Sequence, residues 1–204
     1  MNELLNTIIG QFQQNSALEL IAVVTALAYL ILAVRENILC WPAALISTFI
    51  FLFVFWRVHL YMESALQVYY IAMAIYGWYQ WTRTGEDNRL LPVSTWRPRQ
   101  HLMALLVIII GTAASGYYLQ TSTEARLPYL DSFTTWSSII TTYMVARKIL
   151  ENWLYWLVID AVSIYLYLDR ELYFTALLFA IYIIIIFFGW FSWLKSYQKT
   201  AITV

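Results

Sequence analysis

The chain has 204 residues, of which 62% are hydrophobic and 12% are charged, and its formal net charge is zero. Soluble domains carry about a quarter charged residues, so this composition indicates a protein built for the lipid bilayer. The lack of net positive charge removes the case for a nucleic-acid partner, and the single cysteine, Cys40, excludes an intrachain disulfide.

Residues 1–16 precede the first long apolar run and contain no Lys or Arg. They therefore do not resemble a signal peptide, which begins with a positively charged region. Their apolar residues recur at helical spacing, which predicts a short interfacial segment on the membrane surface.

Seven apolar runs follow, most near the roughly 20 residues that a helix needs to cross the hydrocarbon core. We expect transmembrane helices at residues 17–34, 38–56, 62–81, 101–120, 132–146, 150–168 and 172–194. The fifth run is rich in Ser and Thr, whose hydroxyls gather where a helix faces protein or water. Residues 82–100 hold four arginines and two prolines, which predicts a solvent-facing linker.

Lys and Arg are divided unevenly between the two ends of these helices. Nine of the twelve fall at one end, and three, Arg57, Arg126 and Arg170, fall at the other. Cytoplasmic loops carry an excess of Lys and Arg, so we predict that the nine-charge end is cytoplasmic. The linker 82–100 and the tail 195–204 would then be cytoplasmic, and the N-terminus periplasmic.

The sequence also repeats itself at an offset of 112 residues. The matched positions include Arg35 and Arg147, Trp41 and Trp153, Gly77–Trp78 and Gly189–Trp190, and Trp81 and Trp193. Apolar helices share many Leu and Ile by chance, but Trp, Gly and Arg do not readily align at one offset. We therefore predict two three-helix repeats, at residues 17–81 and 132–194.

One linker helix, at 101–120, separates the repeats and gives them the same orientation. The predicted fold class is an all-α membrane protein whose seven transmembrane helices form two parallel three-helix bundles joined by a linker helix (3+1+3). Parallel repeats of this kind are a known transporter plan, the SWEET-type arrangement included, and the ligand site then lies between the repeats near the bilayer midplane.

The sixth run places aromatic and polar residues on one narrow arc of a helix. Trp153, Trp156 and Asp160 follow at i, i+3 and i+7. A carboxylate near the middle of a membrane span is costly unless it is paired, hydrated or protonated, so Asp160 is a candidate site residue. Aromatic faces beside a carboxylate suit a flat, positively charged ligand, because the rings stack on it and the carboxylate balances its charge.

Two structural alternatives stay open for these residues. Asp160 could instead accept hydrogen bonds from hydroxyls such as those of Thr141 or Thr48 and fix the helix register. Trp153 lies near the end of its span and could belong to the interfacial aromatic belt. Trp156 lies deeper and is the better stacking candidate.

Polar residues on three other runs complete the candidate site. Gln67 lies within the third run, and its amide can both donate to and accept from a polar ligand. The other candidates are Tyr70, Tyr182 and the mid-span pair Ser47 and Thr48. Tyr182 is the repeat mate of Tyr70, that is, the residue at the 112-residue offset.

No enzyme signature is present. The two histidines, His59 and His101, lie at helix edges, and the chain has neither an HExxH nor a GxSxG motif. We predict no catalytic residue, no metal site and no cofactor.

The motifs resemble one transporter family over roughly residues 17–194. They are Glu151-Asn152-Trp153-Leu154-Tyr155-Trp156 with Asp160 downstream, Gly189-Trp190 with Trp193, and, in the first half, Trp41-Pro42, Leu66-Gln67-Val68 and Gly77-Trp78-Tyr79-Gln80-Trp81. This pattern resembles the PnuC-type nicotinamide riboside transporters.

The resemblance implies a SWEET-like homotrimer in the bacterial inner membrane, with one pathway per subunit. It implies facilitated diffusion of the vitamin precursor, which a cytoplasmic kinase then traps by phosphorylation for NAD biosynthesis. It also implies stacking on Trp153 and Trp156 and amide contacts from Asn152 and Gln67. Some members place asparagine on the second helix where this chain has Ser47, which departs from the pattern.

Several functions remain open from the sequence. Thiamin, like nicotinamide riboside, carries a cationic ring that suits Asp160 and two tryptophans, and the family also includes riboflavin transporters. A SWEET-like sugar carrier would need stacking but no deep carboxylate. A ligand-sensing or assembly subunit would carry no flux.

Overall fold

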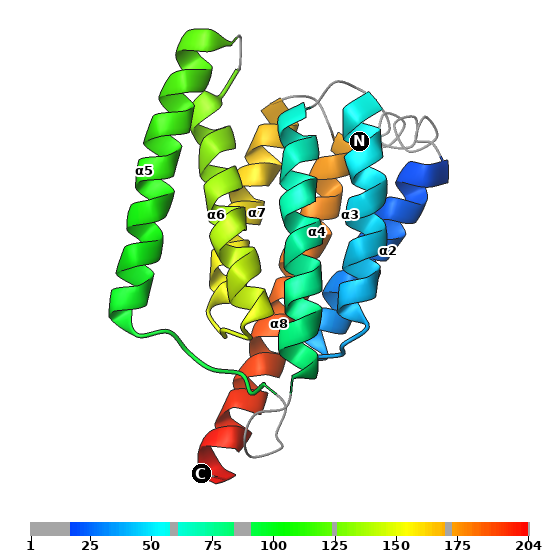
Figure 1. Cartoon of the computed structure of the whole chain (residues 1–204), viewed down its shortest axis with the longest axis vertical. Helices are drawn as coiled ribbons and strands as arrows, with labels where there is room; N and C mark the ends of the chain where they lie inside the picture. Colours follow the sequence, from blue (N-terminus) through cyan, green and yellow to red (C-terminus); the bar gives the residue numbers. More distant parts are fainter. Residues whose placement is uncertain (1–16, 58–60, 84–90, 124–125, 170–172, 204) are drawn as a thin grey trace, which may run out of the picture.

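The computed structural model describes residues 17–57, 61–83, 91–123, 126–169 and 173–203. Within these ranges the chain forms seven α-helices (Figure 1): α2 (Ala17–Val34), α3 (Cys40–Arg57), α4 (Tyr61–Thr82), α5 (Pro98–Ser122), α6 (Pro128–Ala146), α7 (Asn152–Asp169) and α8 (Tyr173–Thr203). Each helix covers one predicted apolar run, so the prediction of an all-α, seven-helix fold is confirmed. The predicted interfacial segment 1–16 lies outside the described residues, as do residues 84–90 of the linker.

Helix ends differ from the apolar runs where turn chemistry sets the boundary. Both α5 and α6 begin with proline, at Pro98 and Pro128. Proline is favoured at the first helical position, because its missing N–H has no intrahelical partner there. Neither Gly nor Pro interrupts residues 195–203, and α8 continues to Thr203, past the predicted end at residue 194. Its last turns project beyond the other helices (Figure 1).

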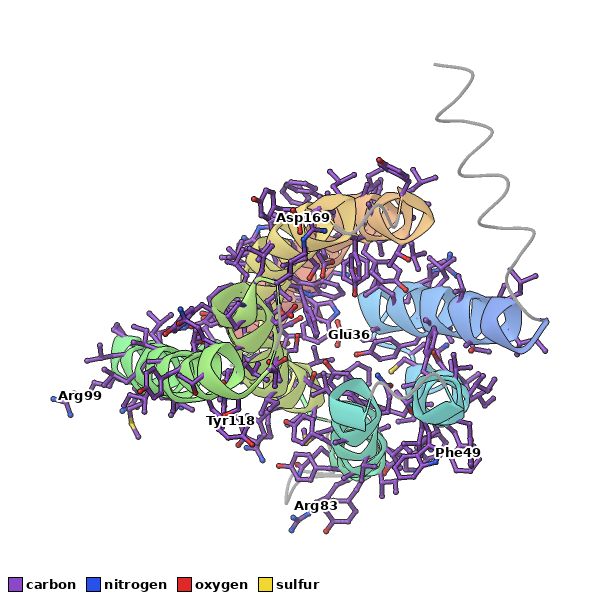
Figure 2. The ribbon with its side chains drawn as sticks, turned by 90° about the horizontal axis from the view of Figure 1, so that it is seen from above. Glu36, Phe49, Arg83, Arg99, Tyr118 and Asp169 are labelled. Atoms are coloured by element: carbon purple, nitrogen blue, oxygen red, sulfur yellow. The ribbon has the colours of Figure 1, made fainter. Side chains whose placement is uncertain are left out.

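Six helices close into a ring in the order α2, α3, α4, α6, α7 and α8, and α8 contacts α2 again. The view along the long axis shows this ring with α5 outside it, packed on α6 (Figure 2). The first helix of each half contacts the third helix of the other half, α2 with α8 and α6 with α4. This pairing has the two-fold character expected of parallel repeats, and it is compatible with the 3+1+3 arrangement.

The linker between the halves is tied to the turn between α6 and α7. Ser94 donates its backbone N–H to the Lys148 carbonyl at 3.0 Å and accepts from the Leu150 N–H at 2.8 Å. The backbone N–H of Trp96 donates to the Glu151 carboxylate at 3.3 Å. These bonds hold the start of α5 and the start of α7 at the same end of the molecule.

The outer surface of the helices is apolar. Val24, Ile110 and Phe188 expose 64%, 65% and 67% of their surfaces. Soluble proteins rarely expose large contiguous apolar patches, so this surface is suited to lipid. By length and mean hydropathy (2.0 and 2.4), α5 and the Thr175–Thr200 part of α8 could each cross a bilayer.

The internal repeat has a packing basis at its two glycines. A Cβ added to Gly77 would overlap the Trp41 ring, and one added to Gly189 would lie 2.6 Å from the Trp153 ring. Trp41 meets Trp81 edge-on at 5.3 Å and 85°, and Trp153 meets Trp193 at 5.4 Å and 88°. Each half therefore uses its glycine to make room for its buried tryptophan.

We expect Gly189→Ala to lower the free energy of unfolding by about 1–3 kcal/mol, the usual cost of adding atoms to a filled core. Thermal unfolding of the purified protein measures this loss. Ser192→Ala is a matched control, because Ser192 lies exposed on the same helix and also becomes alanine. Equal melting temperatures for Gly189→Ala and the wild type would contradict the close contact.

Candidate functional site

A cavity of about 250 Å³ lies between the two halves of the helix ring. All six ring helices contribute to its wall, and most of the lining side chains are apolar or aromatic. Ligand sites typically combine such a wall with a few polar groups that fix orientation. The cavity lies where parallel repeats are expected to form a site.

All nine predicted binding residues line this cavity. They come from four helices: Ser47 and Thr48 from α3, Gln67 and Tyr70 from α4, Asn152, Trp153, Trp156 and Asp160 from α7, and Tyr182 from α8. The structure thus brings together positions from both repeats, and their contact with a ligand stays a prediction.

Asp160 is the one charged side chain among the described residues that line the cavity, and it is 3% exposed. The hydroxyls considered as its structural partners donate elsewhere: Thr48 to the Ala44 carbonyl and Thr141 to the Ser137 carbonyl, each at 2.7 Å. A hydroxyl has one proton to donate, so neither is available to the carboxylate. This geometry favours a role for Asp160 toward the cavity.

The two tryptophans of α7 differ in their surroundings. Trp153 is 1% exposed and packs edge-on against Trp193, so it is a core residue that also forms cavity wall and not an interfacial belt residue. Trp156 is only partly buried and lines the cavity. Trp156 is therefore the ring with more freedom to stack on a ligand.

Asn152 presents a polar atom with no protein partner. Its side-chain N–H donates to the Ile149 carbonyl at 2.6 Å, which fixes the amide. Its Oδ1 is buried and has no hydrogen-bond partner among the described residues. Such an oxygen is costly to leave unpaired, and a ligand N–H or O–H in the cavity would satisfy it. Gln67, 8% exposed, adds a second amide from the opposite repeat.

Each polar or stacking group that could recognise a ligand occurs in one repeat only, although other residues of the cavity wall occur in both repeats. Tyr70 and Tyr182 are repeat mates, and so are Trp41 and Trp153. The mates of the other groups lack their chemistry, as Asp160 corresponds to Thr48, Asn152 to Cys40, Gln67 to Phe179 and Trp156 to Ala44. A cavity with one charge on one side binds an asymmetric ligand in a defined orientation.

Some lining residues were not predicted as site residues. Trp41 and Phe179 could have been found from the 112-residue offset, because they are the mates of Trp153 and Gln67. Tyr29 and Thr142 also line the cavity. Thr142 belongs to the run rich in Ser and Thr, but the sequence does not single it out among those hydroxyls. Tyr29 lies on α2, which is so uniformly apolar that hydropathy does not show which face turns inward.

The site can bind and orient a small molecule. Among the described residues, no group of three or more His, Cys, Asp or Glu is placed to hold a metal ion. The lining side chains supply stacking faces, amides and one carboxylate. A helix-lined cavity of this kind between two parallel repeats defines the chain as a membrane transporter of small molecules.

The comparisons with known proteins identify the family. The family model described as "Nicotinamide mononucleotide transporter" matches residues 16–195, and the chain belongs to this family.

Relatives with assigned functions are transporters. The chain is 27% identical to the nicotinamide riboside transporter PnuC of Escherichia coli (strain K12), over 90% of this chain and 87% of that protein. It is 26% identical to the riboflavin/roseoflavin transporter RibM of Streptomyces davaonensis, over 86% and 83% of the two chains. The fold matches the crystal structure of the vitamin B3 transporter PnuC with a TM-score of 0.74 and 22% identity, covering 96% and 90% of the chains.

Proposed function

We propose that the protein carries nicotinamide riboside across the bacterial inner membrane by facilitated diffusion. The observation that carries this proposal is Asp160, a single carboxylate in an aromatic cavity between the repeats. Nicotinamide riboside has one flat pyridinium ring, which can stack on Trp156 while Asp160 balances its charge. Its carboxamide and ribose hydroxyls can bond to Asn152 and Gln67.

The cavity favours the riboside over its phosphorylated form. No Lys, Arg or His is among the described residues that line the cavity, so nothing there would neutralise a phosphate. Asp160 would repel it. Phosphorylation by a cytoplasmic kinase would therefore trap the vitamin, because the anionic product fits the cavity poorly.

Thiamin is the second candidate, since its cationic ring meets the same carboxylate. Riboflavin, suggested by the similarity to RibM, is less suited. It has three fused rings and no cationic ring for Asp160. A cavity of about 250 Å³ is slightly smaller than the usual range of ligand sites, about 300 to 1,000 Å³, which disfavours a three-ring ligand.

The absence of ion coupling is part of the proposal. Asp160 is the one acidic side chain found in the described lining, and it cannot balance the ligand cation and hold a driving ion at the same time. The two repeats, 17–81 and 132–194, would move relative to each other, with the helix at 101–120 as linker. We further propose the family's homotrimer, with one pathway in each subunit.

Uptake of radiolabelled nicotinamide riboside into liposomes containing the purified protein tests this function. Excess unlabelled nicotinamide riboside should abolish uptake of label, whereas nicotinamide mononucleotide and riboflavin at the same concentration should inhibit weakly. Inhibition by thiamin as strong as by the riboside would make thiamin an equal ligand of the site. Stronger inhibition by riboflavin would contradict the charge argument.

The end of the molecule that carries the linker is proposed to be cytoplasmic, because most Lys and Arg lie there. In a Cys40→Ser background, a thiol introduced by Arg83→Cys should be shielded in intact cells from impermeant reagents. One introduced by Ser122→Cys should react. Both positions are exposed. Arg83 directly follows α4 and Ser122 ends α5, and these two helix ends lie at opposite ends of the molecule (Figure 1). The opposite labelling pattern would reverse the orientation.

A further inference from the structure

The turns that follow α2 and α6 have the same backbone geometry. Glu36 and Lys148 have φ of 53° and 51°. Each N–H bonds back to a carbonyl three residues earlier, and the following N–H bonds to one five residues earlier: Glu36 to Ala33 at 3.0 Å, Asn37 to Leu32 at 2.9 Å, Lys148 to Val145 at 3.0 Å and Ile149 to Met144 at 2.9 Å. Both turns are therefore Schellman motifs.

The left-handed position of this motif normally holds glycine. A residue with a Cβ is disfavoured there by roughly 1–2 kcal/mol. Here charged residues occupy it in both repeats. An outlier of this kind points to a role for the side chain that outweighs the backbone cost.

The two side chains form an ion pair with each other. Lys148 Nζ donates to Glu36 Oε2 at 2.8 Å, and the two residues are 112 positions apart, the offset of the repeat. Their side chains are 9% and 22% exposed. Glu36 lies toward the middle of the helix ring (Figure 2). The pair thus joins the two repeats close to their two-fold axis.

Four tryptophans lie beneath this ion pair. Lys148 Nζ is 4.6 Å from the centre of the Trp81 ring. Trp81 contacts Trp41 at 5.3 Å and Trp193 at 6.0 Å, and Trp193 contacts Trp153 at 5.4 Å. Trp41 and Trp153 are lining residues of the cavity. The cavity is therefore separated from this end of the molecule by four indoles packed edge-on or tilted against one another, with the ion pair next to them.

Trp81 and Trp193, the two of these tryptophans that do not line the cavity, are held differently. Trp193 Nε1 donates to the Ala33 carbonyl at 2.9 Å, which fixes it to the turn of the other repeat. Trp81 Nε1 has no hydrogen-bond partner among the described residues. The ammonium of Lys148 lies over the Trp81 ring at 4.6 Å from its centre, so the ion pair contributes to holding a ring whose own N–H makes no hydrogen bond there.

We propose that the Glu36–Lys148 pair is the latch of a gate that closes the cavity at the linker end, with Trp81 as the part that moves. The proposal rests on the proposed transport function, because a carrier must open its site to each side in turn. Breaking the pair frees Trp81 and opens the path to Trp41 and the cavity.

Cys40 reports the opening of this gate. It is the only cysteine in the chain and is 0% exposed at the start of α3, beside Trp41. We expect Glu36→Gln, Glu36→Lys and Lys148→Glu each to raise the rate of its reaction with a small thiol reagent by about 5- to 30-fold. The double variant Glu36→Lys/Lys148→Glu should react nearly as slowly as the wild type, because the mates share one backbone geometry.

A second reporter separates gating from general loosening. In a Cys40→Ser background, Ser132→Cys places a thiol at a position that is 3% exposed near the opposite end. Glu36→Gln should leave its labelling rate unchanged. Arg126→Ala, which removes an exposed ion pair with Asp169 at that end, should leave Cys40 labelling unchanged.

Slow labelling of Cys40 in Glu36→Gln would overturn the latch, and so would equal acceleration at both reporters or a charge swap that restores nothing. If a charge-reversed single variant does not fold, the nearly isosteric Glu36→Gln decides. Labelling needs no ligand. A failure of nicotinamide riboside uptake with the expected labelling would refute the substrate alone, and uptake with unresponsive labelling would refute the latch alone.

Discussion

Asp160→Asn is expected to weaken the binding of nicotinamide riboside by about 10- to 100-fold, the loss of one partly screened charge pair in a cavity. The substitution keeps the shape of the side chain and removes its charge. The reduced riboside has nearly the same shape and no positive charge, so its affinity should change by less than about threefold. Titration calorimetry with both ligands measures the difference.

The control for this prediction is a threonine outside the cavity wall. Thr25→Val removes a hydroxyl that bonds to its own helix and should leave both affinities near those of the wild type. Equal losses for the charged and reduced ribosides in a folded Asp160→Asn protein would show that the carboxylate does not sense ligand charge.

Trp156→Ala should lower the affinity for nicotinamide riboside by about 2- to 30-fold, because it removes a stacking face for a cationic ring. Trp156→Phe retains an aromatic face and should lose less. Trp156 is partly buried and lines the cavity, so the melting temperature of the Trp156→Ala protein should fall little. Binding and thermal unfolding measured on the same preparations separate the two effects.

Trp78→Ala controls for the loss of a tryptophan as such. Trp78 is 40% exposed on α4 and is absent from the cavity wall. Its substitution should leave ligand affinity unchanged. An affinity loss in Trp78→Ala equal to that in Trp156→Ala would remove the case for stacking on Trp156.

The helices and the repeat could be predicted because the order of residue types along the sequence encodes them. A helix in lipid must make all its backbone hydrogen bonds internally and present about 20 apolar residues. The apolar runs therefore predicted the first residue of six of the seven helices to within three positions. The glycines and tryptophans that match between the repeats make equivalent contacts, because Gly189 packs against the Trp153 ring as Gly77 packs against the Trp41 ring. The candidate site followed from one polar arc on α7.

The ion pair at the linker end could not be predicted in this way. In the sequence, Lys148 is one of the nine positive charges at this end, and no pattern marks Glu36 as its partner. Their left-handed backbone and their contact across the two-fold axis are tertiary properties. The wall contributed by Tyr29 depends likewise on how α2 rotates within the ring, which a uniformly apolar helix does not reveal.

The equilibrium distribution of nicotinamide riboside across liposomes containing only this protein tests the central claim most directly. With the membrane potential clamped at zero, facilitated diffusion predicts that internal and external concentrations of this cation become equal, faster than in protein-free liposomes, with or without a proton or sodium concentration gradient. Addition of a riboside kinase and ATP inside should then raise total internal label. Accumulation of unphosphorylated riboside above the external concentration under an ion gradient at zero membrane potential, or no uptake above protein-free liposomes, would contradict the account.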